Sequence, residues 1–196
     1  MEQYEHHELS HEESLRVITS MIRSAQGTIA HNGFDFIFWG WLLVAASAGH
    51  LALLAIKTAI DPSAVYLIMP AGGLYMWWHH RREAKHERVQ THVDLLMPYV
   101  WGSFAAMLFL GNFFCAYLNT SPIPWILLFI GSATFISGGA LKFRPLMIGG
   151  ATFWSAAAVS FFLDIPAQVV VQGTAMIAGY LIPGYILLRT GQRANV

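Results

Sequence analysis

Charge is scarce in this 196-residue chain, and so is cysteine. Charged residues make up 11% of the sequence, whereas hydrophobic residues make up 56%. The single cysteine, Cys115, excludes an intrachain disulfide and a paired-cysteine metal site. Eleven Lys and Arg residues balance eleven Asp and Glu residues, so the chain lacks the net positive charge typical of nucleic-acid-binding proteins. The composition is that of a membrane-embedded chain.

Several catalytic signatures are also missing. The sequence has no glycine-rich phosphate-binding loop, no Gly-x-Ser-x-Gly nucleophile elbow, and no nucleophile and base placed together within an apolar run. Residues 1–33 are acidic and polar, whereas a signal peptide begins with basic residues followed by an apolar core, so no cleaved signal is expected. These absences argue against an enzyme without excluding one, and the sequence identifies no cofactor.

Six apolar runs are each long enough to cross a membrane as a helix. Each has roughly the 17 to 25 residues that span about 30 Å of hydrocarbon. Backbone polar groups must pair internally in hydrocarbon, and the runs lack the alternation of a barrel, so six helices are predicted. The predicted all-α fold is a polytopic membrane protein with a six-helix transmembrane domain over residues 34–196. Its helices are expected at 34–56, 64–80, 97–118, 123–141, 145–163 and 166–188.

The basic residues fall almost entirely on one side of the predicted membrane. Of the eleven Lys and Arg residues, only Lys57 lies on the opposite side. Basic residues are retained on the cytoplasmic side, so both termini are predicted to be cytoplasmic. The short turns at 119–122 and 164–165 then face outward.

The segment before the first run, residues 1–33, is predicted to contain an amphipathic cytoplasmic helix at about residues 10–31. Ser10 and Glu13 have the spacing of a capping box, and apolar residues follow at alternating steps of three and four. This helix could pack under its own bundle, lie on lipid headgroups, or pair with the same helix of another subunit. The sequence leaves these three arrangements open.

A short pattern recurs in the outward-running helices. A Trp-Gly pair, eight residues, and then Gly with a polar residue occurs twice, and a fainter third copy replaces both Gly residues. The pattern favours a domain built from repeated two-helix hairpins, related by an axis along the membrane normal. The alternative, that Trp and Gly recur only for helix packing, stays open. The copies begin at Trp39, Trp101 and Trp154.

A further set of short sequence motifs is spread along nearly the whole chain. They are Ser14-Leu15-Arg16-Val17-Ile18, Met21-Ile22, Asn32-Gly33-Phe34, Trp39-Gly40-Trp41, Gly49-His50, the stretch 137–150 and Ile182-Pro183-Gly184-Tyr185. In this set the chain resembles a family of small, uncharacterised six-helix bacterial integral membrane proteins. The resemblance implies a location in the bacterial inner membrane, and it implies no activity.

Polar residues within the apolar runs are the first candidates for a functional site. They are His50, with Ser47 one turn before it, Asn112 and Asp164. Ionisable groups are costly in hydrocarbon, so they usually face a bundle interior or a wet cavity and mark a solute or proton path. Histidine also titrates near neutral pH. The competing interpretations are a position near the outer surface for His50, a turn for Asp164 and helix association for Asn112.

Helix-breaking residues within two of the runs are the second set. Pro70 and Pro183 lack an amide donor and therefore free the carbonyls of Tyr66 and Gly179, which could coordinate a cation or line a passage. A proline kink used only for packing is the alternative.

Histidine and carboxylate residues at the predicted cytoplasmic end of the second helix form the third set. His79, Glu83 and His86 share a helical face, with spacing that can bind zinc or a similar divalent ion. The surrounding aromatic and basic residues favour an anchor at anionic headgroups instead. These anchor residues are Trp77, Trp78, Arg81 and Arg82.

Two functions of different classes are compatible with these features. The favoured function is an oligomeric channel or transporter for an ion or small solute, whose path is lined by His50, Asn112 and broken backbone. The alternative is a membrane-anchored regulatory or sensory module that contacts a cytoplasmic protein partner or lipid through its N-terminal helix and the basic loop 81–96. A homo-oligomer in the lipid bilayer is expected, with no nucleic-acid partner.

Overall fold

The computed structural model describes the backbone of residues 11–57, 59–83 and 92–193, and the side chains of 33–57, 59–82 and 95–190. These residues are helical apart from short turns, and none of them forms a strand. The all-α prediction is thereby confirmed. The elements are α1 (His11–Ile56), the 3₁₀ helix η1 (Pro62–Leu67), α2 (Ile68–Glu83), α3 (His92–Leu118), α4 (Ile123–Ala140), α5 (Arg144–Ser160), α6 (Ile165–Met176), the π-helix η2 (Ile177–Leu181) and α7 (Ile182–Arg193).

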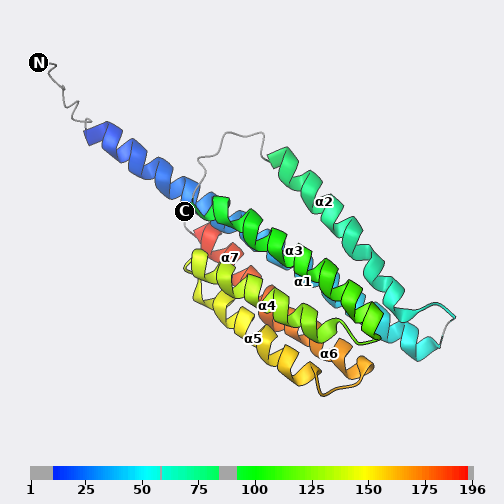
Figure 1. Ribbon diagram of the computed structural model, residues 1–196. Coiled ribbons are helices and arrows are strands. Elements are labelled where there is room, and N and C mark those ends of the chain that lie inside the picture. Colours follow the sequence, from blue (N-terminus) through cyan, green and yellow to red (C-terminus); the bar gives the residue numbers. More distant parts are fainter. Residues whose placement is uncertain (1–10, 58, 84–91, 194–196) are drawn as a thin grey trace, which may run out of the picture.

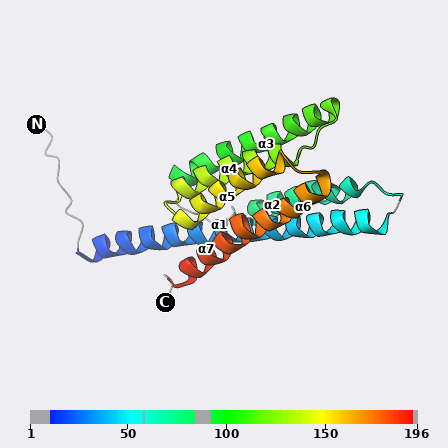
Figure 2. The same ribbon diagram turned by 90° about the horizontal axis from the view of Figure 1, so that it is seen from below.

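The helices run back and forth in two layers (Figure 1, Figure 2). One layer holds α3, α4 and α5, and the other holds α1, α2, α6 and α7. The most extensive contact is between α4 and α5, and α1 packs mainly on α7 and α6. By contrast, α2 touches mainly α1 and η1, and α3 touches mainly α4. The core is therefore built from α1 and α4 to α7, with α2 and α3 at its margins.

Four helical stretches in the described part are long and apolar enough to cross a membrane. The two remaining passes, α2 and α5, have 16 and 17 residues. Because α5 joins the end of α4 to the start of α6, it runs antiparallel to α4 along the same length of the bundle (Figure 1). These apolar helices are compatible with a membrane protein, while six crossings stay a prediction. The four stretches are Gly33–Ile56, Leu95–Leu118, Ile123–Ala140 and Ile165–Thr190.

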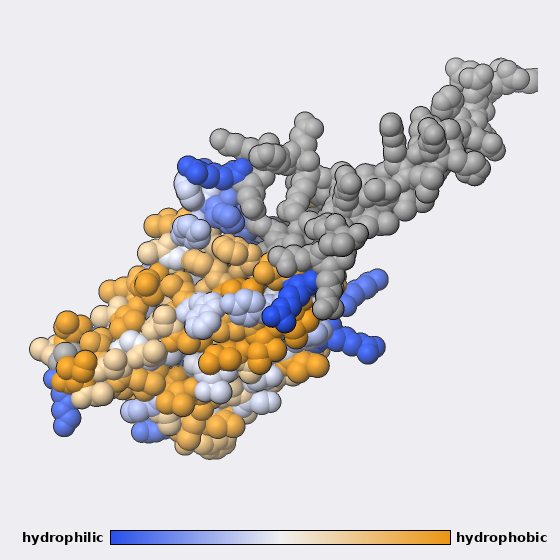
Figure 3. All heavy atoms as spheres, turned by 180° about the vertical axis from the view of Figure 1, so that it is seen from behind, coloured by the Kyte–Doolittle hydropathy of each residue, from blue (hydrophilic) through white to orange (hydrophobic). Residues whose placement is uncertain are grey.

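The distribution of polar and apolar residues along the bundle is compatible with a membrane location. Figure 3 shows apolar side chains over most of one face, with the strongly hydrophilic residues toward its ends. Lys57 follows α1 at one end, here called the Lys57 end, and the opposite end is called the Arg189 end. The charge asymmetry of the sequence is thus an asymmetry between two ends of the bundle. Which end is cytoplasmic stays a prediction. The Arg189 end carries Arg81, Arg82, Lys142, Arg144 and Arg189.

The first helix is longer than the sequence indicates. It has 46 residues and passes through the predicted boundary after residue 33 without interruption. At 1.5 Å per residue it measures roughly 69 Å, about twice the thickness of the hydrocarbon core. The predicted helix at 10–31 is therefore continuous with the first predicted crossing, and the side chains of its residues lie outside the described part.

Two other boundaries also differ from the sequence prediction. The second pass begins as the 3₁₀ helix η1 before α2 starts at Ile68. The fifth ends at Ser160 rather than at 163, because the amides of residues 161–163 bond to carbonyls of the preceding turn and close the helix. The predicted hairpins are not the main packing units, since α4 with α5 and α1 with α7 make the larger contacts.

Three helices end at a residue with left-handed backbone. Lys57, Asn119 and Lys142 have φ of 52°, 51° and 52°. After α4, the Lys142 amide donates to the Gly139 carbonyl (3.1 Å) and the next amide donates to the Gly138 carbonyl (2.8 Å), which is a Schellman motif. The last carbonyls of α4 are therefore satisfied within the turn.

The π-helix brings two backbones into direct contact. Pro183 lacks an amide to bond Gly179, and the Ile182 amide instead donates to Ile177, five residues back. The Gly179 carbonyl lies against Gly149 of α5, where an added Cβ would collide with it. Glycine at both positions lets the helices approach closely, as is common for helices in membranes.

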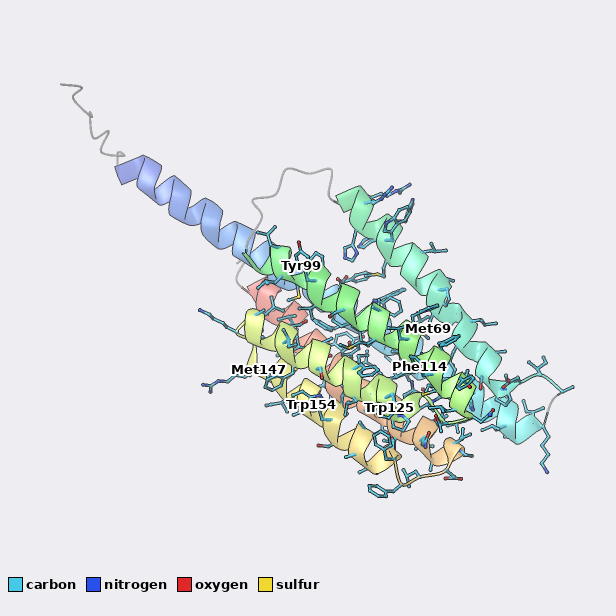
Figure 4. All side chains as sticks on the ribbon, in the orientation of Figure 1. Met69, Tyr99, Phe114, Trp125, Met147 and Trp154 are labelled. Atoms are coloured by element: carbon cyan, nitrogen blue, oxygen red, sulfur yellow. The ribbon has the colours of Figure 1, made fainter. Side chains whose placement is uncertain are left out.

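Aromatic side chains fill the space around this contact. Tyr180 is buried, with ring centroids 5.1 Å from Phe153 and 5.3 Å from Phe36, and its hydroxyl hydrogen-bonds the Thr134 hydroxyl (3.3 Å). On the neighbouring side Trp154 spans from α5 to α4, with its ring centroid 5.0 Å from that of Phe135 (Figure 4). The two layers are thus joined through η2.

We expect Gly149→Ala to lower the free energy of unfolding by about 1–3 kcal/mol, because the new methyl group must push α5 away from η2. Thermal unfolding of the purified protein in detergent micelles measures the effect. Gly139→Ala is the matched control, since a Cβ there meets no atom within 4 Å. Equal melting temperatures for the two variants would contradict the proposed contact.

Candidate functional site

A buried polar face lies on α1 near the Lys57 end. Ser47 and His50 are three residues apart, so they lie on the same side of the helix. Both are almost completely buried, with 3% and 4% of their surface exposed. The face is directed at α6, where a Cβ added to Gly173 would lie 3.4 Å from the Ser47 Cβ.

The 3₁₀ helix η1 places Tyr66 over this face. Asp61 caps η1 by accepting a hydrogen bond from the Ser63 amide (2.9 Å), and Pro62 fixes the first turn. The Tyr66 and His50 rings are 5.7 Å apart at 53°. The turn after α1 therefore brings an aromatic ring against the histidine and places the Asp61 carboxylate at the same end of the bundle.

Two glutamines of α6 complete a polar seam. Gln172 is 1% exposed, and its Oε1 accepts a hydrogen bond from the Tyr66 hydroxyl (2.9 Å). Gln168, one turn earlier and 6% exposed, donates from Nε2 to the carbonyls of Ser160 (3.0 Å) and Leu163 (2.9 Å). Its Oε1 accepts from the Ser121 hydroxyl. This polar seam of Ser47, His50, Tyr66, Gln168 and Gln172 therefore links α1 and η1 to α6. Through Gln168 it also links α6 to the turns that follow α3 and α5.

Several buried atoms of the seam have no hydrogen-bond partner in the described part of the chain. They are Ser47 Oγ, His50 Nδ1 and Ser160 Oγ. A buried polar atom without a partner costs about 1–3 kcal/mol, and such atoms are rare in folded proteins. These atoms are therefore available to form hydrogen bonds with water or a polar solute, or to exchange a proton.

Comparison with other proteins adds nothing to this geometry. No protein-family model matches the chain, and neither a curated protein nor a solved structure is significantly similar to it. The family resemblance noted in the sequence therefore stays a prediction. A function must be argued from the arrangement of the described residues.

The structure brings together three of the residues predicted to form a solute or proton path. His50, Ser47 and Tyr66 meet in the seam, although Tyr66 contributes its hydroxyl rather than the carbonyl that the sequence analysis proposed. Asn112 lies on the exposed side of α3, and Asp164 is exposed in the turn before α6. These last two are not part of the seam.

The two prolines are also separate from the seam. Pro70 is exposed in the first turn of α2, where a proline breaks no helix. Pro183 is buried after η2, and the Gly179 carbonyl contacts Gly149. Position in the first turn accounts for Pro70 and packing accounts for Pro183, so a role for Pro70, Gly179 or Pro183 in a path rests on the sequence alone.

The predicted metal site cannot be assembled from the described side chains. His79 lies against Phe34 and Tyr75, with ring centroids 5.2 Å and 6.0 Å away. The Glu83 side chain and all of His86 lie outside the described residues. Within the described part, no group of three potential metal ligands occurs.

The predicted lipid anchor has a definite geometry. Arg81 lies over the Trp77 ring (3.9 Å to the centroid) and Arg82 over the Trp78 ring (3.7 Å). Both indoles are about half exposed. Nearby, His80 Nε2 is 3.2 Å from Asp35 Oδ2 and links α2 to α1. Such cation–π pairs at a helix end suit the membrane interface, and their role as an anchor stays a prediction.

The residues that hold the seam together were not predicted from the sequence. Gln168 and Gln172 are four apart within an apolar run, and this spacing was a usable signal, because both amides must lie on one helix face and need partners. Ser121 carried no such signal, since it lies in a turn where serine is common.

A double-mutant cycle tests the central hydrogen bond. Tyr66→Phe leaves Gln172 Oε1 buried without its donor and should cost about 1–3 kcal/mol of unfolding free energy. Combined with Gln172→Leu, the loss should be smaller than the sum of the single losses by roughly 0.5–1.5 kcal/mol. The measurement is unfolding in detergent micelles. Tyr99→Phe, at an exposed tyrosine, should have no effect; strictly additive losses at Tyr66 and Gln172 would show that the bond contributes nothing.

Proposed function

We propose that the chain is an oligomeric channel or transporter for an ion or small polar solute, with a proton as the first candidate, and that His50 is its central residue. The observation that carries the proposal is a buried histidine, 4% exposed and with Nδ1 unpartnered, inside the candidate span Gly33–Ile56. Ionisable groups within membrane helices are rare, and each one is a candidate functional residue.

The neighbours of His50 have the chemistry that a relay needs. Imidazole accepts a proton at one nitrogen while it donates from the other, and hydroxyl groups both donate and accept. Ser47 lies one turn before His50 on the same face, and the Tyr66 ring lies 5.7 Å from the imidazole, with its hydroxyl donating to Gln172. Asp61 is exposed at the Lys57 end, where its charge favours entry of a cation. In the predicted orientation this end faces outward.

The outer surface of α3 supports assembly into oligomers. Only 6% of its most apolar window is buried within the chain. Gly102, Ala105, Phe109, Asn112 and Ala116 follow at steps of three and four, so they form one stripe, and all five are exposed. Small residues permit close approach of a second helix, and an amide can pair with its own symmetry mate. A second copy of α3 is the partner that suits this stripe.

One observation favours the regulatory alternative. Because α1 is continuous from His11 to Ile56, a displacement of its N-terminal part reaches the seam without passing through a hinge. A sensor built in this way needs no flux, so measurements of flux separate the two functions.

Transport is tested by reconstituting the full chain into vesicles that contain a pH-sensitive dye, under an imposed potential, and by following solute-driven swelling in parallel. We expect flux above that of protein-free vesicles, and a loss on the order of tenfold or more in His50→Gln, because the amide cannot pass on a proton. Thr174→Val is the control, since its hydroxyl donates to its own helix at Val170 (2.9 Å) on the exposed side.

Absence of flux for protons, common ions and small solutes would overturn the transport proposal and leave the regulatory alternative. Equal flux in wild type and His50→Gln would remove His50 from the path.

Disulfide cross-linking in native membranes tests the α3 stripe. In a Cys115→Ala background, Asn112→Cys should form intermolecular disulfides on mild oxidation, because a symmetric contact would bring the two Cα atoms within about 7 Å. Phe113→Cys, one residue away and 62% exposed, points to another side of α3 and is the matched control. Equal cross-linking at both positions, or none at Asn112→Cys, would contradict this interface.

A further inference from the structure

An apolar groove lies on the outside of the bundle between α1 and the last helix. The groove has a volume of about 540 Å³ and runs along η2 and α7, beside Trp41 of α1. The Trp41 indole N–H donates to the Tyr185 hydroxyl (3.1 Å), which fixes both rings against each other. The groove is lined by Trp41, Ile177, Leu181, Ile182, Tyr185, Ile186 and Arg189.

The groove has the length of one membrane leaflet. From Ile177 to Arg189 the helix rises roughly 18 Å, and half of the hydrocarbon core is about 15 Å. Arg189 is the only charged lining residue and lies one residue before the end of the candidate span Ile165–Thr190. The charge is therefore at the level of the headgroups, while the apolar lining extends toward the bilayer centre.

Arg189 is available to an anion. It is exposed, and within the described side chains no carboxylate forms an ion pair with it. A guanidinium binds phosphate through two parallel hydrogen bonds and is always charged. We infer that this groove binds an anionic phospholipid, with the phosphate on Arg189 and one acyl chain along Trp41 and the isoleucines of η2 and α7.

The apolar lining with one charge at its end favours a phospholipid over a polar solute. A polar solute would find almost no hydrogen-bonding group below Arg189. The site does not involve His50, so its existence is independent of the proposed transport function.

Native mass spectrometry of the full chain in detergent tests the inference, with phosphatidylglycerol and phosphatidylethanolamine titrated separately. We expect tighter binding of phosphatidylglycerol, and Arg189→Gln should weaken it about fivefold, which is the contribution of one interfacial basic residue. Arg144→Gln is the matched control, because Arg144 is exposed at the same end but does not line the groove. It should leave binding unchanged.

A second pair of variants tests the acyl-chain position. Ile186→Trp should fill the groove and reduce binding of both lipids, whereas Ile148→Trp, at an exposed isoleucine of α5, should not. Binding that is equal for the two lipids, equal in Arg189→Gln and Arg144→Gln, or unchanged in Ile186→Trp would overturn the inference. Melting temperatures of the four variants show whether each one is folded.

Discussion

The close approach of α5 to the π-helix at Gly149 and Gly179 is the contact on which the other features of this bundle depend. A π turn holds one residue more than an α turn, so the helix after it is rotated by roughly 100° relative to an uninterrupted α-helix. This rotation lets α6 direct its glutamines at α1 and η1, while α7 packs its buried Leu187 within the core. The same rotation places Ile182 and Ile186 beside Trp41, so the groove follows from this irregular turn.

Much of the fold could be predicted from hydropathy and charge. Hydrocarbon demands long apolar helices and excludes basic residues, so the helix positions and the asymmetry between the Lys57 and Arg189 ends can be seen in the sequence. The long α1 could not, because the polar residues before Gly33 suggest a separate segment, whereas a helix needs no apolar surface to continue beyond the membrane.

The candidate site was predictable only where sequence neighbours share a face. Ser47 and His50 are on one helix, so their spacing places them together. The meeting of His50 with Tyr66 depends on the turn capped by Asp61, and the contact with Gln172 depends on how α6 packs. Such contacts between distant parts of the chain follow from packing, which hydropathy does not encode. The apolar groove depends on the π turn, and a proline in the sequence does not by itself predict a π turn.

On the exposed side of the helices, a hydroxyl group satisfies its only donor within its own helix, whereas an amide group cannot satisfy all of its hydrogen-bonding groups in this way. Ser132 donates to the Leu128 carbonyl (3.0 Å), and Thr174 donates to the Val170 carbonyl (2.9 Å), so each hydroxyl hides its only donor against its own helix.

Asn112 uses the same device, donating from Nδ2 to the Leu108 carbonyl (2.8 Å). An amide, however, has a second N–H and an acceptor oxygen, and neither has a partner within the described residues. In hydrocarbon both remaining groups would be unsatisfied, at a cost that exposed serine and threonine avoid. The proposed α3 interface would give both of these groups a partner on a neighbouring helix.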